Sequence, residues 1–262
     1  MKTRLSSIAQ RLAAITAGTA LVLALAFAQT SADSAAENHF NSGKKMTAEG
    51  NLPGAVAEYR KAIEAAGGNY PEAYNNLGMV QGMMEDLTGA IKSFNTAIEQ
   101  SKGDYAEAHY NLGVALSITD DLAGAEREFQ TAVRQKPGDF PEAHANLGIL
   151  YARKGDSKRA ITAFQIAIEQ AEGFYPEAHY NLGIAYFTSG NIEASVAEFK
   201  DSIDQSDNFP EAHYNLAVAL SRLGRNEDAV AEFEAYLKTA SNPKDIDEVR
   251  NRIGELRKAS LR

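Results

Sequence analysis

Residues 175–183 read Y-P-E-A-H-Y-N-L-G, and this stretch decides the fold because close copies of it recur along the chain. The copies are Y-P-E-A-Y-N-N-L-G at 70–78, Y-A-E-A-H-Y-N-L-G at 105–113, F-P-E-A-H-A-N-L-G at 140–148 and F-P-E-A-H-Y-N-L-A at 209–217. Their leucines recur every 34 or 35 positions. A fixed period of this length predicts an array of stacked structural repeats rather than a series of globular domains.

Six copies align when the position of Pro71 is counted as position 1. They span 36–70, 71–105, 106–140, 141–175, 176–209 and 210–243. In most copies the apolar or small residues at positions 3, 7, 8, 10 and 11 follow one face of a helix, and in all copies those at positions 20, 24, 27 and 28 follow one face of a second helix. Glycine at position 15 and proline at position 1 favour a helix end and a helix start. Each copy is therefore predicted to form two helices joined by a turn.

These residues resemble the tetratricopeptide repeat, which has Leu-Gly at positions 7 and 8, Ala at 20, a bulky residue at 24 and Ala at 27. The resemblance covers residues 36–243. It implies an all-α fold, an α-solenoid wound as a right-handed superhelix, whose concave groove binds peptides or proteins. The first copy departs from the pattern with Ser42 at position 7, as expected of a terminal repeat.

The segments on either side of the array have their own patterns. In residues 244–262 an apolar face of Ile246, Val249, Ile253 and Leu256 predicts a helix that caps the last copy, with Asn242 and Pro243 at its start. A docking helix is the alternative. Residues 1–32 combine three basic residues, an apolar stretch at 13–28 and small residues that fit cleavage, which indicates a secretory signal peptide. A retained membrane anchor is the alternative. Either reading predicts an exported chain, periplasmic or secreted.

Composition excludes several classes of function. The chain has no Cys, which excludes disulfides and thiolate chemistry. Its formal net charge is −9, and removal of Lys2, Arg4 and Arg11 with the N-terminal segment leaves 23 basic and 35 acidic residues, or −12. Such a chain repels nucleic acid and anionic lipid. No nucleotide-binding, hydrolase or metalloprotease motif occurs, so neither an enzyme nor a cofactor is predicted.

All five histidines stand at position 4, where the family often has Trp or Tyr: His39, His109, His144, His179 and His213. Equivalent positions in neighbouring repeats lie roughly 8–10 Å apart, whereas Zn²⁺ needs nitrogen ligands at about 2.0–2.1 Å. We expect no second ligand type that repeats beside the histidines. We therefore predict that their rings pack between helices, and any further role stays open.

Asparagine occupies position 6 in every copy: Asn41, Asn76, Asn111, Asn146, Asn181 and Asn215. Asparagine is a poor helix former, so its repetition opposes helix propensity. The resemblance to the family places position 6 in the concave groove. The asparagines at this position are similar to the asparagine row in the repeats of O-GlcNAc transferase, which implies that the groove holds an extended segment through its main chain. The alternative is that each Asn hydrogen-bonds between neighbouring helices and sets the stack.

Apolar and aromatic residues stand beside the asparagines at positions 5 and 9. The candidates for partner contact are Tyr110, Tyr180, Tyr214, Ile149 and Ile184. We call positions 5, 6 and 9 the groove face. Position 2 is Glu in every copy, so a neutral, apolar or basic partner is favoured over an acidic one. The sequence thus predicts a scaffold or adaptor of the cell envelope that binds an extended peptide or a partner helix. The alternatives are a self-assembling array and an accessory subunit of an envelope enzyme complex.

Overall fold

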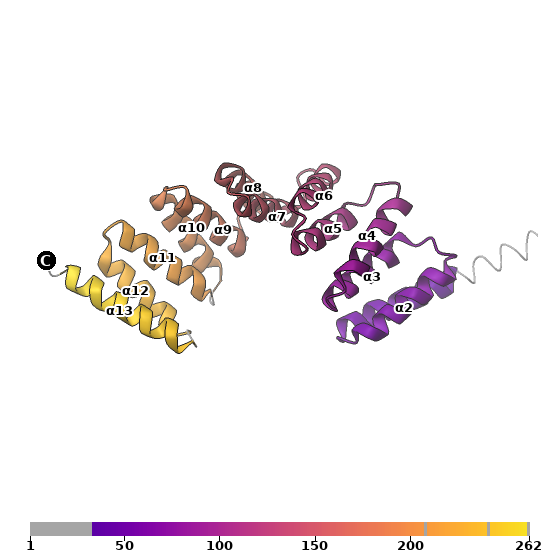
Figure 1. The fold of residues 1–262 in the computed structure, drawn as a ribbon, viewed down its shortest axis with the longest axis horizontal. Helices are drawn as coiled ribbons and strands as arrows, with labels where there is room; N and C mark the ends of the chain where they lie inside the picture. The colour runs from indigo at the N-terminus through magenta and orange to yellow at the C-terminus, as the bar shows by residue number, and fades with distance from the viewer. Residues whose placement is uncertain (1–32, 207–208, 240–241, 261–262) are drawn as a thin grey trace, which may run out of the picture. The chain divides into compact units, whose positions relative to one another are not determined.

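The computed structural model describes residues 33–206, 209–239 and 242–260. The predicted signal peptide at 1–32 lies outside these residues. Every regular element in the described part of the chain is an α-helix, which confirms the all-α solenoid class (Figure 1). Among the described helices, none is both long and apolar enough to cross a bilayer.

A helical segment at residues 33–48 is the first helix of the first copy. It is followed by α2 (Leu52–Ala65), α3 (Pro71–Met83), α4 (Leu87–Gln100), α5 (Ala106–Ile118), α6 (Leu122–Gln135), α7 (Pro141–Arg153), α8 (Ser157–Gln170), α9 (Pro176–Thr188), α10 (Ile192–Gln205), α11 (Pro210–Arg222), α12 (Asn226–Leu237) and α13 (Pro243–Ser260). Helix α2 is the second helix of the first copy, each later copy has two helices, and a single helix, α13, follows the last copy.

The chain forms two compact units, one ending at Ala115 and the other beginning at Leu116. In the first unit α3 packs against both α2 and α4. In the second unit each helix from α6 to α13 packs against the next, and the first helices of successive copies, α7, α9 and α11, also contact one another (Figure 1). Each unit is thus a stack of helix pairs in which neighbouring pairs share an interface.

Local sequence sets where the helices begin and end. The first helices α3, α7, α9 and α11 begin at the predicted prolines, each followed by a Glu in the first turn, where it favours the positive end of the helix. Five second helices have an Asn or Asp cap whose side chain accepts a hydrogen bond from the backbone three residues later: Asn51, Asp86, Asp121, Asp156 and Asn191. The turn between the two helices uses a left-handed residue at position 15 even where glycine is replaced, at Glu85 (φ 64°) and Asp120 (φ 67°).

The core of a copy is an aromatic ring at position 24 packed on the small residue at position 8, which is glycine in every copy except the last, where it is Ala217. The position-24 ring of Phe164 is 1% exposed, and a Cβ at Gly148 in position 8 would lie 2.5 Å from its Cε1. The same relationship joins Gly183 to Phe199, at 2.6 Å. Glycine at position 8 therefore allows the first helix to approach the ring that the second helix supplies, as the spacing predicted.

Glutamine at position 30 fastens the turn of the preceding copy, a feature that sequence analysis did not single out. Gln100 accepts a hydrogen bond from the backbone nitrogen of Tyr70 at 3.0 Å and donates one to the carbonyl of Gly68 at 2.7 Å. Gln170 accepts an equivalent bond from Phe140 at 3.1 Å. Since these bonds join residues about 30 positions apart, they fix how one copy sits on the next.

The predicted cap is present at the end of the second unit. Helix α13 buries Val249 and Ile253 against Ala217 and Phe233 of the last copy. Leu256 packs beside them and is half-buried. Helix α13 thus covers the apolar face that a seventh copy would otherwise cover.

Candidate functional site

Four histidines make polar contacts that the sequence analysis missed. The Nδ1 atoms of His39, His179 and His213 each lie 2.7 Å from a carboxylate oxygen nineteen residues later, on the second helix of the same copy. In the fourth, His109, the Nε2 atom lies 3.1 Å from the carbonyl oxygen of Gly103. The expectation that no second ligand type stands beside the histidines was therefore wrong, because position 23 holds a glutamate in these copies.

His179 has the most complete environment. Its Nδ1 contacts Glu198, its Nε2 lies 3.2 Å from the carbonyl oxygen of Gly173, and its ring is buried. The hydrogen bond with Glu198 raises the pKa of His179, against the opposing effect of burial. Asp201 brings a third potential metal ligand within 4.8 Å of the other two. The hydrogen bond between His179 and Glu198 already gives both groups a partner, so this cluster requires no metal.

His144 is the exception among the histidines. Position 23 of its copy is Ala163, which is buried and offers no carboxylate. Burial lowers the pKa of His144. The half-buried ring of His144 therefore favours the uncharged form more than a free histidine does.

Three asparagines of the groove face bond within their own helix. Asn76, Asn146 and Asn181 each donate from Nδ2 to the carbonyl four residues earlier, at 2.8, 3.0 and 2.8 Å. All three are half-buried. For Asn76 and Asn181, no described residue hydrogen-bonds to the side-chain oxygen. Their amides therefore keep an acceptor at the surface of α3 and α9.

Two asparagines instead link neighbouring copies. Asn111 donates to the side-chain oxygen of Asn75 at 3.0 Å, and Asn215 donates to the hydroxyl oxygen of Tyr180 at 2.9 Å. Asn75 and Tyr180 both stand at position 5 of the preceding copy. Asn41, in the first copy, is exposed. The alternative of a bond between neighbouring helices therefore holds at Asn111 and Asn215, and the role in holding a partner's main chain stays a prediction.

The other groove-face residues differ in exposure. Ile149 and Ile184 are 40% and 36% exposed. Tyr110, Tyr180 and Tyr214 are half-buried. The ring of Tyr180 lies 4.8 Å from that of Phe209, centroid to centroid, so part of this aromatic surface stabilises the stack itself.

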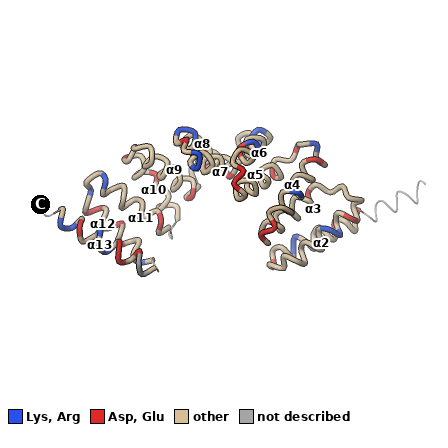
Figure 2. Tube along the Cα trace, in the orientation of Figure 1, with Lys and Arg blue, Asp and Glu red and all other residues tan. Residues whose placement is uncertain are grey.

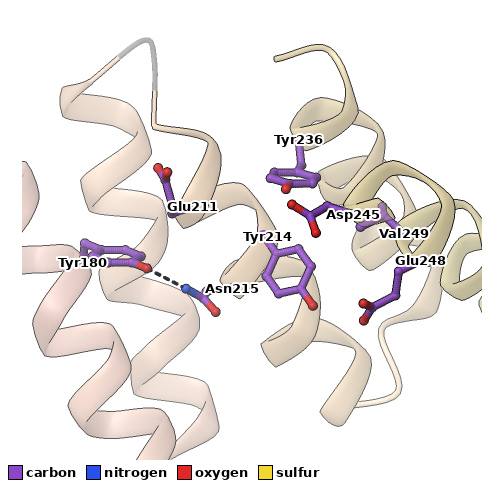
Figure 3. Close-up of a pocket in the computed structure, with 8 residues that line it drawn as sticks. All are labelled: Tyr180, Glu211, Tyr214, Asn215, Tyr236, Asp245, Glu248 and Val249. Atoms are coloured by element: carbon purple, nitrogen blue, oxygen red, sulfur yellow. Dashed lines mark hydrogen bonds between the residues drawn. The ribbon is translucent and has the colours of Figure 1, made fainter. Parts of the chain in front are cut away.

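Residues of the groove face line a cavity of about 350 Å³ in the second unit, which we call the tyrosine pocket (Figure 3). Tyr180, Tyr214 and Asn215 come from α9 and α11. The remaining lining residues are Glu211 in the first turn of α11, Tyr236 on α12, and Asp245, Glu248 and Val249 on α13. Figure 3 shows Asp245 reaching toward the rings of Tyr236 and Tyr214.

Residues of the groove face also line other cavities, including one of about 680 Å³ in the second unit that is lined by Val218 of α11 and Arg252 of α13. In the second unit a cavity of about 70 Å³ is lined by Ile184, Asn215 and Val218 together with residues of α9 and α10. In the first unit Phe40 and Asn41 line a cavity of about 430 Å³, with Glu37 at position 2. The structure thus brings groove-face residues together in each unit. The predicted residues that line none of these cavities are Asn76, Asn111, Asn146, Asn181, Tyr110 and Ile149.

Sequence analysis missed three residues of the tyrosine pocket. Tyr236 stands at position 27, which is small in the other five copies, and this exception was its signal. Asp245 and Glu248 lie on the predicted cap helix, where acidic residues gather at its N-terminal end (Figure 2). Burial raises the pKa of Tyr236, and the Asp245 carboxylate raises it further. The Tyr236 hydroxyl therefore stays protonated beside a negative group.

Comparison with known proteins identifies the repeat. The model of the tetratricopeptide repeat family matches residues 77–140, 145–210 and 180–246, more than half of the chain. No relative was found among curated proteins by sequence comparison. Among solved structures, a crystal structure of MamA protein is 26% identical and covers 66% of this chain and 92% of its own, with a TM-score of 0.57.

Two further solved structures share the fold at lower identity. The pilF protein of Pseudomonas aeruginosa is 13% identical, with a TM-score of 0.75, and the match covers 84% of this chain and 99% of that one. YrrB, described as a TPR protein with an unusual peptide-binding site, is 20% identical with a TM-score of 0.60, and the match covers 74% of this chain and 97% of that one.

Proposed function

This chain belongs to the tetratricopeptide repeat family of protein-interaction scaffolds, and we propose that its groove face holds an extended segment of a partner protein. Members of the family generally bind peptide or protein partners and are not enzymes. The proposal assigns the asparagines to the main chain of the partner and the residues at positions 5 and 9 to its side chains.

The position of Asn215 is the observation that carries this proposal. Asn215 lines both the tyrosine pocket and the small cavity beside Ile184. One asparagine of the groove face therefore lies between a site lined by tyrosines and a smaller apolar site lined by Ile184, Phe187 and Phe199, each open to a side chain. An extended segment presents alternate side chains along its length, with amide groups between them, and this arrangement suits such a segment.

The chemistry of asparagine supports the same assignment. An amide side chain carries both donors and an acceptor, which matches the backbone N–H and C=O of a peptide. At Asn76 and Asn181 the internal bonds use the side-chain nitrogen, so the oxygen can accept from a partner N–H. YrrB offers a precedent on the same fold, since a peptide-binding site is described in that protein.

We also propose that the chain acts outside the cytoplasm, in the cell envelope. The basic, apolar and small-residue order of residues 1–32 supports export. Mass spectrometry of the chain recovered from the periplasmic fraction tests this. A new N-terminus just after Ala28 or Ala32 is expected for cleavage, whereas an intact chain confined to the cytoplasm would exclude export.

The groove assignment is tested by photo-crosslinking in cells. A photoreactive amino acid placed at Ile184 should join the partner, because this side chain lies on the groove face and is 36% exposed. The matched control is Phe174, an apolar residue that is 69% exposed in the turn between two copies. Crosslinks of equal yield at both positions would refute the groove. Crosslinks that join two copies of this chain would instead support the self-assembling array.

A further inference from the structure

The tyrosine pocket has an unusual charge for a binding cavity. Three of its lining residues are acids, Glu211, Asp245 and Glu248, and no lysine or arginine whose side chain the structure describes lines it. The volume of about 350 Å³ lies near the lower end of the roughly 300–1,000 Å³ found for cavities that hold small organic groups. The pocket therefore combines room for one side chain with negative charge.

Among the described residues, only one of these carboxylates has a basic partner. Glu248 pairs with Arg252 one helical turn later, at 3.0 Å. Glu211 and Asp245 form no ion pair with any described residue. They come from different helices, α11 and α13, so the pocket presents negative charge from both of these elements (Figure 3).

The aromatic lining adds a second feature that attracts cations. The rings of Tyr214 and Tyr236 meet edge to face, with centroids 5.4 Å apart and an interplanar angle of 63°. The face of an aromatic ring attracts a cation. Arg252 already lies over Tyr214, with its Cζ 5.9 Å from the ring centroid, so this ring takes a guanidinium within the protein itself. Position 27 carries a tyrosine in the last copy alone, and this difference separates the pocket from the rest of the groove face.

We propose that the tyrosine pocket binds one basic side chain, lysine or arginine, of the partner segment. This rests on the proposed function, because the basic residue belongs to the segment held along the groove face. The ammonium or guanidinium group is neutralised by Glu211 and Asp245, and its aliphatic stem lies against the tyrosine rings.

A metal ion is a poorer occupant than an organic cation. Ligand atoms around a metal must converge on one point. Among the described residues, the one group of three such atoms within 4.8 Å of one another is His179 with Glu198 and Asp201, outside this pocket. The acids of the tyrosine pocket instead surround a volume, as the recognition of a larger cation requires.

The test uses the full chain and three capped peptides: Ala-Ala-Lys-Ala-Ala, the same peptide with norleucine for Lys, and the same peptide with Glu for Lys. Norleucine keeps the aliphatic stem and removes the charge. Binding is followed by NMR of labelled tyrosine rings. The lysine peptide should bind about tenfold more tightly than the norleucine peptide, and added salt should reduce this difference. Equal affinities for the lysine and norleucine peptides would overturn the proposal.

Variants place the interaction within the pocket. Glu211→Gln combined with Asp245→Asn should lower the affinity for the lysine peptide to that for the norleucine peptide. The matched control combines Glu142→Gln, at the equivalent position of α7, with Asp247→Asn on α13, and it should change nothing. Tyr236→Ala should weaken lysine binding without harming the fold, since five copies carry Ala or Ser at this position. An unchanged affinity in the Glu211 and Asp245 variant would also overturn the proposal.

Failure of this inference is distinguishable from failure of the groove. Capture of a partner by crosslinking at Ile184, together with equal affinities for the lysine and norleucine peptides, would support the groove face as the binding surface. The same result would refute the proposal that the pocket binds a basic side chain. If the lysine peptide binds as expected but Ile184 and Phe174 crosslink equally, the pocket stands as a cation site and the groove is refuted.

Discussion

Nδ1 of His179 lies 2.7 Å from Oε2 of Glu198 and joins the first helix of its copy to the second. The pairs at His39 and His213 repeat this contact. Where His144 stands opposite an alanine, burial dominates and the pKa of the ring moves in the other direction. We therefore expect the histidines at position 4 of these two copies to change the stability of the fold in opposite directions as the pH rises.

The pair at His179 should stabilise the fold most at low pH. Because the folded pKa of His179 is raised, its contribution is fully present below the unfolded value of about 6.5 and is lost as pH rises through the folded value. His179→Gln should therefore lower the free energy of unfolding more at pH 6 than at pH 8. Urea unfolding at both values checks this, and an equal loss at both would contradict it.

His144 should show the reverse dependence. Its folded pKa is lowered by burial, so the stability it contributes is present above about 6.5 and is lost as pH falls. His144→Tyr installs the residue that Tyr74 supplies at the same position of the second copy. The stability of this variant relative to the original chain should be greater at pH 5.5 than at pH 8. A relative stability that does not change with pH would show that His144 does not titrate differently on folding.

The aromatic residue at position 24 should dominate the stability of its copy. Phe164 is 1% exposed and packs on Gly148, so Phe164→Ala should lower the free energy of unfolding by about 3–5 kcal/mol. Phe174→Ala is the matched control, because that ring is 69% exposed and should cost less than about 0.5 kcal/mol. Similar losses in the two variants, measured by urea unfolding, would rule out this account of the core.

Replacement of Glu85 by glycine should stabilise the first unit. Glu85 has φ 64°, a conformation that costs a residue with a side chain about 1–2 kcal/mol. Glycine loses about 0.5–1 kcal/mol in chain entropy, so Glu85→Gly should gain about 0.5–1 kcal/mol. Asp120→Gly should gain less, because Asp120 also pairs with Arg153 at 2.9 Å. A lower melting temperature for Glu85→Gly would contradict this reasoning.

The fold could be predicted from sequence because its determinants lie close together along the chain. The proline, the small residues and the ring at position 24 act within one copy, and they recur with one period. The left-handed turn residue was recognised at position 15, and the structure keeps that conformation at Glu85 and Asp120, where glycine is absent. The hydrogen bonds from Gln100 and Gln170 to the turn of the preceding copy were missed, because they join residues about 30 positions apart in two different copies.

The candidate site was less predictable because its residues depend on neighbours in other copies. Asn215 bonds to Tyr180 and Asn111 to Asn75, so the role of each Asn depends on position 5 of the preceding copy. The contribution of Asp245 depends on how α13 docks, which periodicity does not give. The histidine pairs were visible in principle, since Glu at position 23 accompanies His at position 4 in four copies.

The central claim is that asparagines of the groove face hold the main chain of the partner. The direct test is the affinity of the captured partner for the variant with Asn76→Ala and Asn181→Ala. These two make internal bonds only to their own helices, unlike Asn111, whose loss would strand the buried Asn75. The control is Asn95→Ala, which removes an Asn with the same bond to the carbonyl four residues earlier, at 2.9 Å, from the second helix α4.

We expect the double variant to bind the partner about tenfold more weakly, since each lost hydrogen bond contributes about 0.5–1.5 kcal/mol. The control should bind as the original chain does. All three proteins should keep their helical fold, because alanine is the better helix former. Equal affinity of the double variant and the control, measured by calorimetry on the purified proteins, would contradict the account.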